Sequence, residues 1–220
     1  MPAVVFDFDG LMIDSESEIA ACIIEALGVR GITLAIEEIA HLFGSTDEDA
    51  EWERVLASVG DVTLAELRVE VDAVLPARVD ALPLLPGVIE VLDAAHAAGW
   101  RTGIATGQER GRLDQHLARF GLRERFDAIV TRREVPSGKP APDIYLEVAD
   151  RLGVAPSECL ALEDSLPGYL SARAAGMSVI VCPSPVTAGC AFPPGTRRVG
   201  SLIEVELTTR ERRSAASGDG

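Results

Sequence analysis

The feature that most constrains this chain is residues 4–10 (VVFDFDG), in which an apolar run ends in two carboxylates one residue apart. A buried strand that ends in acids and a glycine places acidic side chains at the edge of a sheet. The two-residue period of a strand places Asp7 and Asp9 on one side and Phe8 on the other, and Gly10 lets the chain turn away. Two acids this close need a cation nearby. The alternative is an aspartate-rich turn after an edge strand, which the heptapeptide alone leaves open.

The residues that follow predict a helical module. Amphipathic helices are expected near 16–27, 35–43, 47–59 and 63–80, with no convincing strand between them. Ser15 is expected to be the N-cap of the first helix, with Glu18 as its capping-box partner. Residues 15–82 hold fifteen acids and four arginines, a net charge of −11, and are therefore predicted to form a separate acidic cap domain.

From residue 83 onward the pattern alternates between helices and short apolar runs. Strands are predicted at 101–106, 126–130, 159–162 and 178–182, with a helix between each pair. Strands separated in this way form parallel βαβ units in an open sheet. The predicted fold class is α/β, a Rossmann-like doubly wound parallel sheet core (1–14 and 83–207) with an inserted α-helical cap domain (15–82). The polar residues 208–220 are expected to form a disordered tail.

The net charge and the composition of the chain exclude several classes of binding partner. The 220 residues carry a net charge of −15, which repels nucleic acid and anionic membrane surfaces, so neither is expected as a partner. No secretory signal and no membrane-spanning apolar run is evident. The four cysteines form no Cys-x-x-Cys pair, which argues against zinc and against a disulfide framework. We expect a reduced cytoplasmic protein that is a monomer or a weak homodimer.

Polar side chains gather where the predicted strands end, which is the edge where open α/β sheets bind ligands. They are Asp7, Asp9, Thr106, Glu163 and Asp164. Lys139 precedes a helix at the same edge and is the only lysine in the chain, the other basic residues being arginines. A compact ammonium that must reach an oxyanion is not equivalent to a planar guanidinium, so Lys139 is predicted to act in the site. The alternative is a surface lysine in a turn.

Four carboxylates and a backbone carbonyl at one edge form a set of hard oxygen ligands suited to Mg²⁺ and not to zinc. A divalent cation also lets clustered acids stay ionised. A carboxylate, a hydroxyl, an ammonium and Mg²⁺ at one point could carry out phosphoryl transfer. They supply a nucleophile, a hydrogen-bond donor and two sources of positive charge.

Four ordered motifs in this chain resemble those of the haloacid dehalogenase superfamily. They are DFDG at 7–10, ATG at 105–107, GKPAPD at 138–143, and EDS at 163–165 followed by Gly168 and AAGM at 174–177. The resemblance covers almost the whole chain. A helical insert after the first motif is similar to the branch that contains β-phosphoglucomutase and small sugar-phosphate phosphatases.

The resemblance implies a role for each motif residue. Asp7 would be the nucleophile that forms an aspartyl-phosphate, and Asp9 the general acid and then the general base. Thr106 would hold the phosphoryl oxygens with the amide of Gly107, and Lys139 would neutralise charge.

The resemblance also implies a Mg²⁺ site. Its ligands would be Asp7, the main-chain carbonyl of Asp9, and Asp164, with Glu163 either a ligand or an acid behind the ligands. Gln108 stands where relatives often have serine, and is predicted either to contact the leaving group of the substrate or to serve only as a polar helix start.

The predicted function is a magnesium-dependent phosphatase acting on a small phosphorylated metabolite, a sugar or polyol monophosphate. Dehalogenating relatives lack the second aspartate, which is present here as Asp9, and phosphonate-cleaving relatives need a cap lysine, which is absent. The acidic cap disfavours a second anionic group on the substrate unless its charge faces outward.

Three alternatives stay open. A β-phosphoglucomutase-type mutase needs a cap arginine to hold a second phosphate; residues 43–49 contain none, although Arg54 could substitute. A phospho-acceptor signalling domain uses similar groups but needs no cap. A catalytically silent binding module is the third.

Overall fold

The computed structural model describes residues 2–43 and 48–207. The predicted tail (208–220) and most of the cap stretch in which the mutase arginine was sought lie outside these residues. Among the described helices, none is both long enough and apolar enough to cross a membrane.

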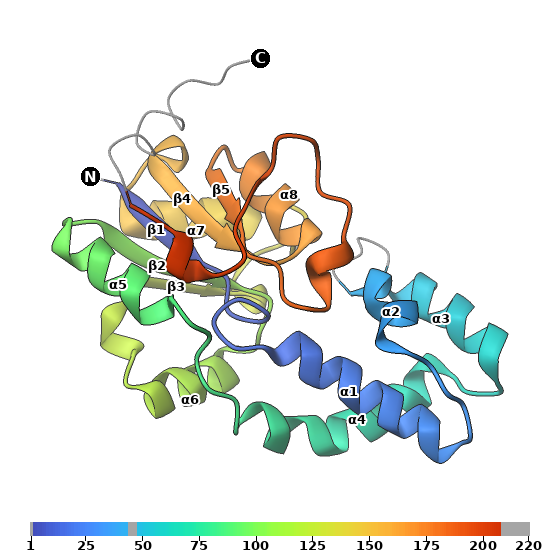
Figure 1. Ribbon diagram of the computed structural model, residues 1–220. Helices are drawn as coiled ribbons and strands as arrows, with labels where there is room; N and C mark the ends of the chain where they lie inside the picture. The colour runs from blue at the N-terminus through green and yellow to red at the C-terminus, as the bar shows by residue number, and fades with distance from the viewer. Residues whose placement is uncertain (1, 44–47, 208–220) are drawn as a thin grey trace.

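The core is a six-stranded sheet of parallel strands in the order β3-β2-β1-β4-β5-β6 (Figure 1). Its strands are β1 (Ala3–Phe6), β2 (Arg101–Thr106), β3 (Ala128–Thr131), β4 (Cys159–Glu163), β5 (Ser178–Val181) and β6 (Arg197–Arg198). The four strands predicted after residue 83 are confirmed to within about two residues at each end. The short β6 was not predicted, because two exposed arginines carry no apolar pattern.

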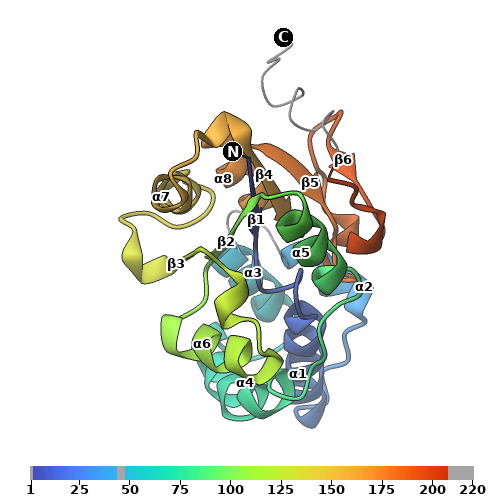
Figure 2. The same cartoon turned by 90° about the vertical axis from the view of Figure 1, so that its left-hand side faces the viewer.

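Helices cover both faces of the sheet, which confirms the doubly wound α/β class (Figure 2). They are α5 (Val88–Ala97), α6 (Arg110–Phe120), α7 (Asp143–Leu152) and α8 (Leu166–Ala174). The alternation of β1 divides its side chains between the two faces. Val4 and Phe6 pack in a cluster with residues of α5 and α6, whereas Val5 packs with α7 and α8.

The regular elements in the described residues of the insert after β1 are all helices, joined by short loops. It contains α1 (Ser15–Val29), α2 (Ile36–Ile39), α3 (Glu48–Val59) and α4 (Leu64–Val79). The helix expected at 35–43 is instead α2 followed by a 3₁₀ turn, η1 (Ala40–Leu42). These elements share a hydrophobic cluster that includes Leu27, Leu42 and Trp52, so the insert has a core of its own. The exact division between cap and core domains stays a prediction.

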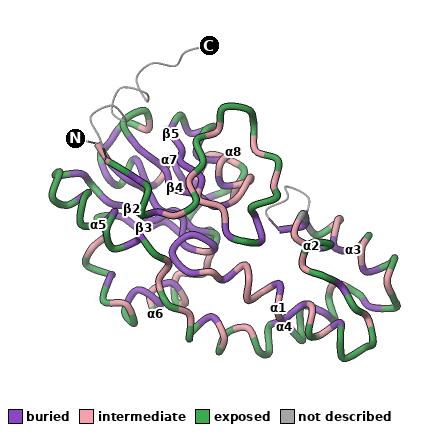
Figure 3. The backbone as a smooth tube through the Cα atoms, in the orientation of Figure 1, coloured by how far each residue is buried: buried purple, intermediate pink, exposed green. Residues whose placement is uncertain are grey.

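Short 3₁₀ turns occur elsewhere in the core. They are η2 (Arg123–Arg125), η3 (Arg132–Glu134), η4 (Pro156–Glu158), η5 (Thr187–Gly189) and η6 (Leu202–Glu204). Figure 3 shows that burial is concentrated in the strands, while the helices of the insert alternate between buried and exposed positions.

One local prediction was wrong. Asp14, not Ser15, is the N-cap of α1, and its side chain accepts a hydrogen bond from the Ser17 amide. Ser15 is the first helical residue, and its hydroxyl is turned back toward the end of β1. The reason is that a second hydrogen-bonding partner, Asp9, competes for the Ser15 hydroxyl.

Candidate active site

The ends of three adjacent strands bring the predicted acids together. In the register, Phe6 of β1 lies between Ile104 of β2 and Leu162 of β4, so the next residues along the three strands approach the same point. Asp7 follows β1, and Glu163 is the last residue of β4. Both side chains are buried, with relative exposures of 6% for Asp7 and 0% for Glu163.

Lys139 lies in the turn before α7 and reaches both of these acids. Its Nζ is 2.9 Å from Asp7 Oδ1 and 2.5 Å from Glu163 Oε1. Burial would lower the pKa of the ammonium, but the two carboxylates outweigh it, so the pKa of Lys139 is raised. The lysine therefore stays charged against the two acids.

Glu163 is enclosed by donors from its own chain. Its Oε1 also accepts a hydrogen bond from the Tyr145 hydroxyl at 2.5 Å, and its Oε2 accepts from the Ser165 hydroxyl at 3.4 Å. On the remaining side it lies against Gly168, where a Cβ would stand 2.0 Å from the carboxylate. Both oxygens of Glu163 are thus engaged, which fits an anchor for Lys139 better than a metal ligand.

Asp9 follows two residues after Asp7 and is surrounded by neutral hydrogen-bond donors. The Ser15 hydroxyl donates to its Oδ1 at 3.1 Å, and Gln108 Nε2 donates to the same oxygen at 2.9 Å. Thr106 Oγ1 is 3.4 Å from Oδ2. Burial raises the pKa of Asp9, and the hydrogen bond from Ser15 is the largest of the effects that oppose the rise. A carboxyl group with a raised pKa is suited to carrying a proton to a leaving group.

Asp164 completes the cluster beside Asp7. It is buried, and its carboxylate lies so close to Gly10 that a Cβ there would stand 2.1 Å from Oδ2. The positive φ of Gly10 (+74°) is the second reason for glycine at this position. Burial, then Asp7, then Glu16 raise the pKa of Asp164, and burial raises that of Asp7 to about 7.

Among the described residues, Asp7, Glu163 and Asp164 form a group whose carboxylate oxygens lie within 4.8 Å of one another. Burial and neighbouring acids raise the pKa values of Asp7 and Asp164, so both carboxylates would gain from a divalent cation, and hard oxygen donors favour Mg²⁺. The donor set therefore fits the predicted metal.

The remaining predicted residues lie beside Asp9. Thr106 ends β2 and is fully buried, and the amide of Gln108 donates to its hydroxyl at 3.1 Å. Gly107 follows Thr106, with open space where a Cβ would stand. Gln108 contacts Asp9 through Nε2, while its Oε1 is buried without a hydrogen-bond partner. All the predicted site residues thus lie at one end of the sheet.

Three residues of the site were not predicted as such. Ser15 was predicted to be a helix cap, Glu16 was only counted among the acids of the cap, and Tyr145 was not singled out. The only signal for Tyr145 was a hydroxyl on an otherwise apolar helix face.

Comparison with known proteins supports the resemblance seen in the motifs. A family model described as haloacid dehalogenase-like hydrolase matches residues 1–176. Hexitol phosphatase B of Escherichia coli K12 is 33% identical over 83% of this chain and 84% of that protein. Fructose-1-phosphate phosphatase YqaB of Escherichia coli K12 is 34% identical over 80% of this chain and 94% of that protein.

Solved structures agree with the sequence relatives. CbbY of Rhodobacter sphaeroides, solved in complex with phosphate, is 29% identical, with a TM-score of 0.72 over 93% of this chain and 96% of that one. A variant of the same CbbY has been solved with xylulose-(1,5)-bisphosphate.

Proposed function

The chain belongs to the haloacid dehalogenase-like hydrolases, and on that premise we propose that it is a magnesium-dependent phosphatase of a small phosphorylated metabolite, a sugar or polyol monophosphate. The observation that carries the proposal is the contact of Lys139 with both Asp7 and Glu163. It places the only lysine of the chain against the acid that would attack phosphorus. The phosphatases named among the relatives support the choice of substrate class.

In the proposed reaction a carboxylate oxygen of Asp7 attacks phosphorus. The new bond from Asp7 to phosphorus forms as the ester bond breaks, and Asp9 gives its proton to the departing alcohol. Asp9 then takes a proton from water, which attacks the aspartyl-phosphate and returns Asp7 as a free carboxylate. Thr106 and the Gly107 amide would donate to the phosphoryl oxygens, and Lys139 would offset their charge.

Magnesium would be held by Asp7, Asp164 and the main-chain carbonyl of Asp9. When bound, it supplies positive charge to the phosphoryl oxygens and to the surrounding acids. Glu163 would act through Lys139, because its own oxygens already accept hydrogen bonds from protein groups. Gln108 is proposed to contact the leaving group through its unpartnered Oε1.

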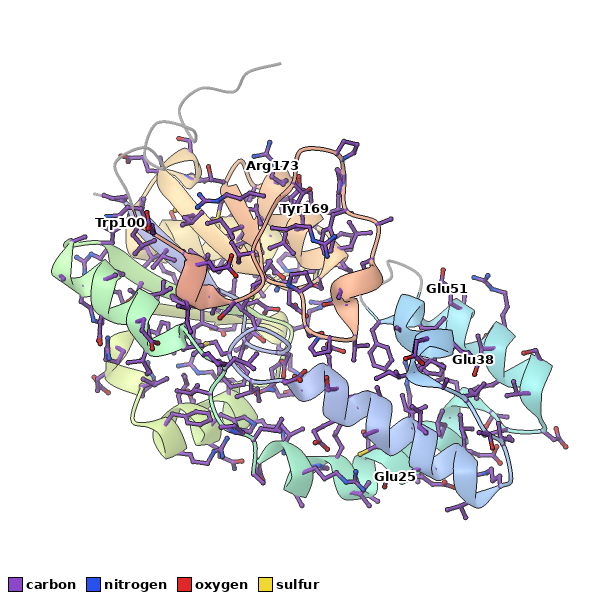
Figure 4. The ribbon with its side chains drawn as sticks, viewed as in Figure 1. Glu25, Glu38, Glu51, Trp100, Tyr169 and Arg173 are labelled. Carbon is purple, nitrogen blue, oxygen red and sulfur yellow. The ribbon has the colours of Figure 1, made fainter. Side chains whose placement is uncertain are left out.

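The charge of the cap affects whether the substrate can carry a second phosphate. Figure 4 labels Glu25 and Glu38 on helices of the cap; both are exposed, and Glu25 is paired with Arg78. The acidic charge thus opposes a second phosphate less than its total suggests, since exposed charges are screened. Bisphosphates therefore belong in the substrate panel, as does the mutase alternative.

Phosphate release from a panel of substrates tests the proposal. The panel holds sugar, polyol, amino-alcohol and nucleotide monophosphates and sugar bisphosphates, assayed with Mg²⁺ and with a chelator. We expect turnover of sugar or polyol monophosphates only with Mg²⁺, and its loss in Asp7→Asn. The matched control is Asp61→Asn, an exposed acid of the cap, which should retain wild-type turnover. Preference for nucleotides or bisphosphates would overturn the substrate class, and turnover by Asp7→Asn would overturn the covalent route.

A further inference from the structure

The segment that follows β5 contacts the cap as well as the core. Val186 is 1% exposed and packs in the hydrophobic cluster of the cap together with Leu42 and Trp52. Four residues later the thiol of Cys190 donates to the main-chain carbonyl of Phe43 at 3.3 Å. In Figure 1 this orange segment reaches the region of α2, and η5 packs against η1. Residues 184–190, the strap, thus take part in the core of the cap.

Thr187, which follows Val186 in the strap, reaches the active site. Thr187 is fully buried, and its Oγ1 lies 3.5 Å from Asp164 Oδ2. The same oxygen accepts a hydrogen bond from the Ser184 amide at 2.9 Å and lies 3.1 Å from the Ser184 hydroxyl. Ser184 Oγ in turn accepts from the Thr187 amide at 3.2 Å.

These contacts determine where the hydroxyl protons go. An amide can only donate, and an ionised carboxylate can only accept. The arrangement in which every group is satisfied has the Ser184 hydroxyl donating to Thr187 and the Thr187 hydroxyl donating to Asp164. Asp164 Oδ2 then accepts a hydrogen bond from the Thr187 hydroxyl, which restrains the orientation of the carboxylate.

We propose that Thr187 is a positioning residue for Asp164, and that the strap links the packing of the cap to the orientation of this metal-binding carboxylate. The inference rests on the proposed function for the role of Asp164. Adjacent residues of one tight turn cannot move independently, so a shift of Val186 with the cap displaces the hydroxyl of Thr187. Partners behind a metal ligand contribute to metal affinity because they hold the ligand in its binding orientation.

Magnesium affinity tests the first half of the inference, measured by calorimetric titration of the full chain with Mg²⁺ alone. Thr187→Val keeps the shape and removes the hydroxyl, and should weaken Mg²⁺ binding by about 10-fold or more. Thr187→Ser restores the hydroxyl and should restore affinity to within about threefold of wild type. The matched control is Thr196→Val, because the Thr196 hydroxyl donates to Pro193 within the same loop.

Val186→Ala tests the second half, since Val186 packs with the cap and contributes no ligand. We expect Mg²⁺ affinity to fall by about twofold or more, together with faster amide exchange in α2 and η1. This milder change keeps the link to the cap testable if Thr187→Val fails to fold.

Wild-type Mg²⁺ affinity in Thr187→Val, or no recovery in Thr187→Ser, would refute the positioning role. Unchanged Mg²⁺ affinity in Val186→Ala would refute the link to the cap. A wild-type chain that binds no Mg²⁺ would refute the inference together with the proposed metal. Failure of the phosphatase proposal is distinguishable, because it shows as absent phosphate release while the Mg²⁺ titrations need no substrate.

Discussion

Replacing Lys139 by methionine should destabilise the protein strongly and in a pH-dependent way. The side chain keeps its length but loses the ammonium that lies 2.9 Å from Asp7 and 2.5 Å from Glu163. Breaking a buried ion pair by removing one partner costs about 3–5 kcal/mol, because the other charge stays buried without compensation. For a chain of this size each kcal/mol lowers the melting temperature by about 2–4 °C, so we expect a loss of roughly 6–20 °C at pH 8.

The pH dependence follows from the acids left behind. Burial raises the pKa of Asp7 from its ordinary 3.8 to about 7 in the folded protein, and the pKa rises further without the ammonium. An acid whose folded-state pKa is raised binds more protons in the folded state than in the unfolded state. The free energy of unfolding of the protein therefore falls as the pH rises from about 4 through the folded-state pKa. The difference between wild type and Lys139→Met should therefore shrink when the pH falls from 8 to 5.5.

Thermal unfolding followed by circular dichroism, with a chelator present to remove metal, measures both quantities. The control is Arg133→Met, which removes an exposed ion pair with Glu109 and should change the melting temperature by less than about 2 °C. An equal loss at both pH values, or a loss no larger than the control, would refute the electrostatic account of Lys139.

Three further predictions concern other parts of the molecule. Gly168→Ala pushes a methyl group against the Glu163 carboxylate, and should lower the free energy of unfolding by about 1–3 kcal/mol and reduce turnover; a fully active, fully stable variant would contradict the packing described. Mg²⁺ should raise the melting temperature more at pH 8 than at pH 5.5, because the metal competes with protons for acids such as Asp7; the reverse order would show that the acids do not hold the ion. Thr63→Ala breaks the reciprocal bonds with Glu66 at the start of α4, and should cost about 1 kcal/mol in chemical denaturation while leaving turnover unchanged.

The parts of the fold that could be predicted are those that local sequence patterns indicate. The alternation of apolar runs with helix-length segments predicted the parallel sheet, and the acids after β1 and β4 therefore had to meet at one edge. Lys139 could be predicted because it is the only lysine of the chain. Its place near Asp7 was also predicted, but its ion pair with Glu163 was not, since the loop that carries Lys139 has no periodic pattern.

The residues that were missed act through neighbours distant in sequence. Ser15 has the residue type of a helix cap, and only its approach to Asp9 shows that its hydroxyl is used in the site. Tyr145 fits the apolar stripe of α7 until the position of Glu163 is known. Thr187 lies in a segment with neither strand nor helix pattern, where the fold alone brings it to Asp164.

The most direct test of the central claim is to trap the phosphoryl group on the protein. A single turnover with the best monophosphate of the panel is quenched in acid, reduced with borohydride and digested, and the peptide that contains position 7 is sequenced by mass spectrometry. Reduction converts an aspartyl-phosphate into homoserine, which we expect at position 7 in the wild type and not in Asp7→Asn. Homoserine at another position, or continued turnover with none detected, would contradict attack by Asp7.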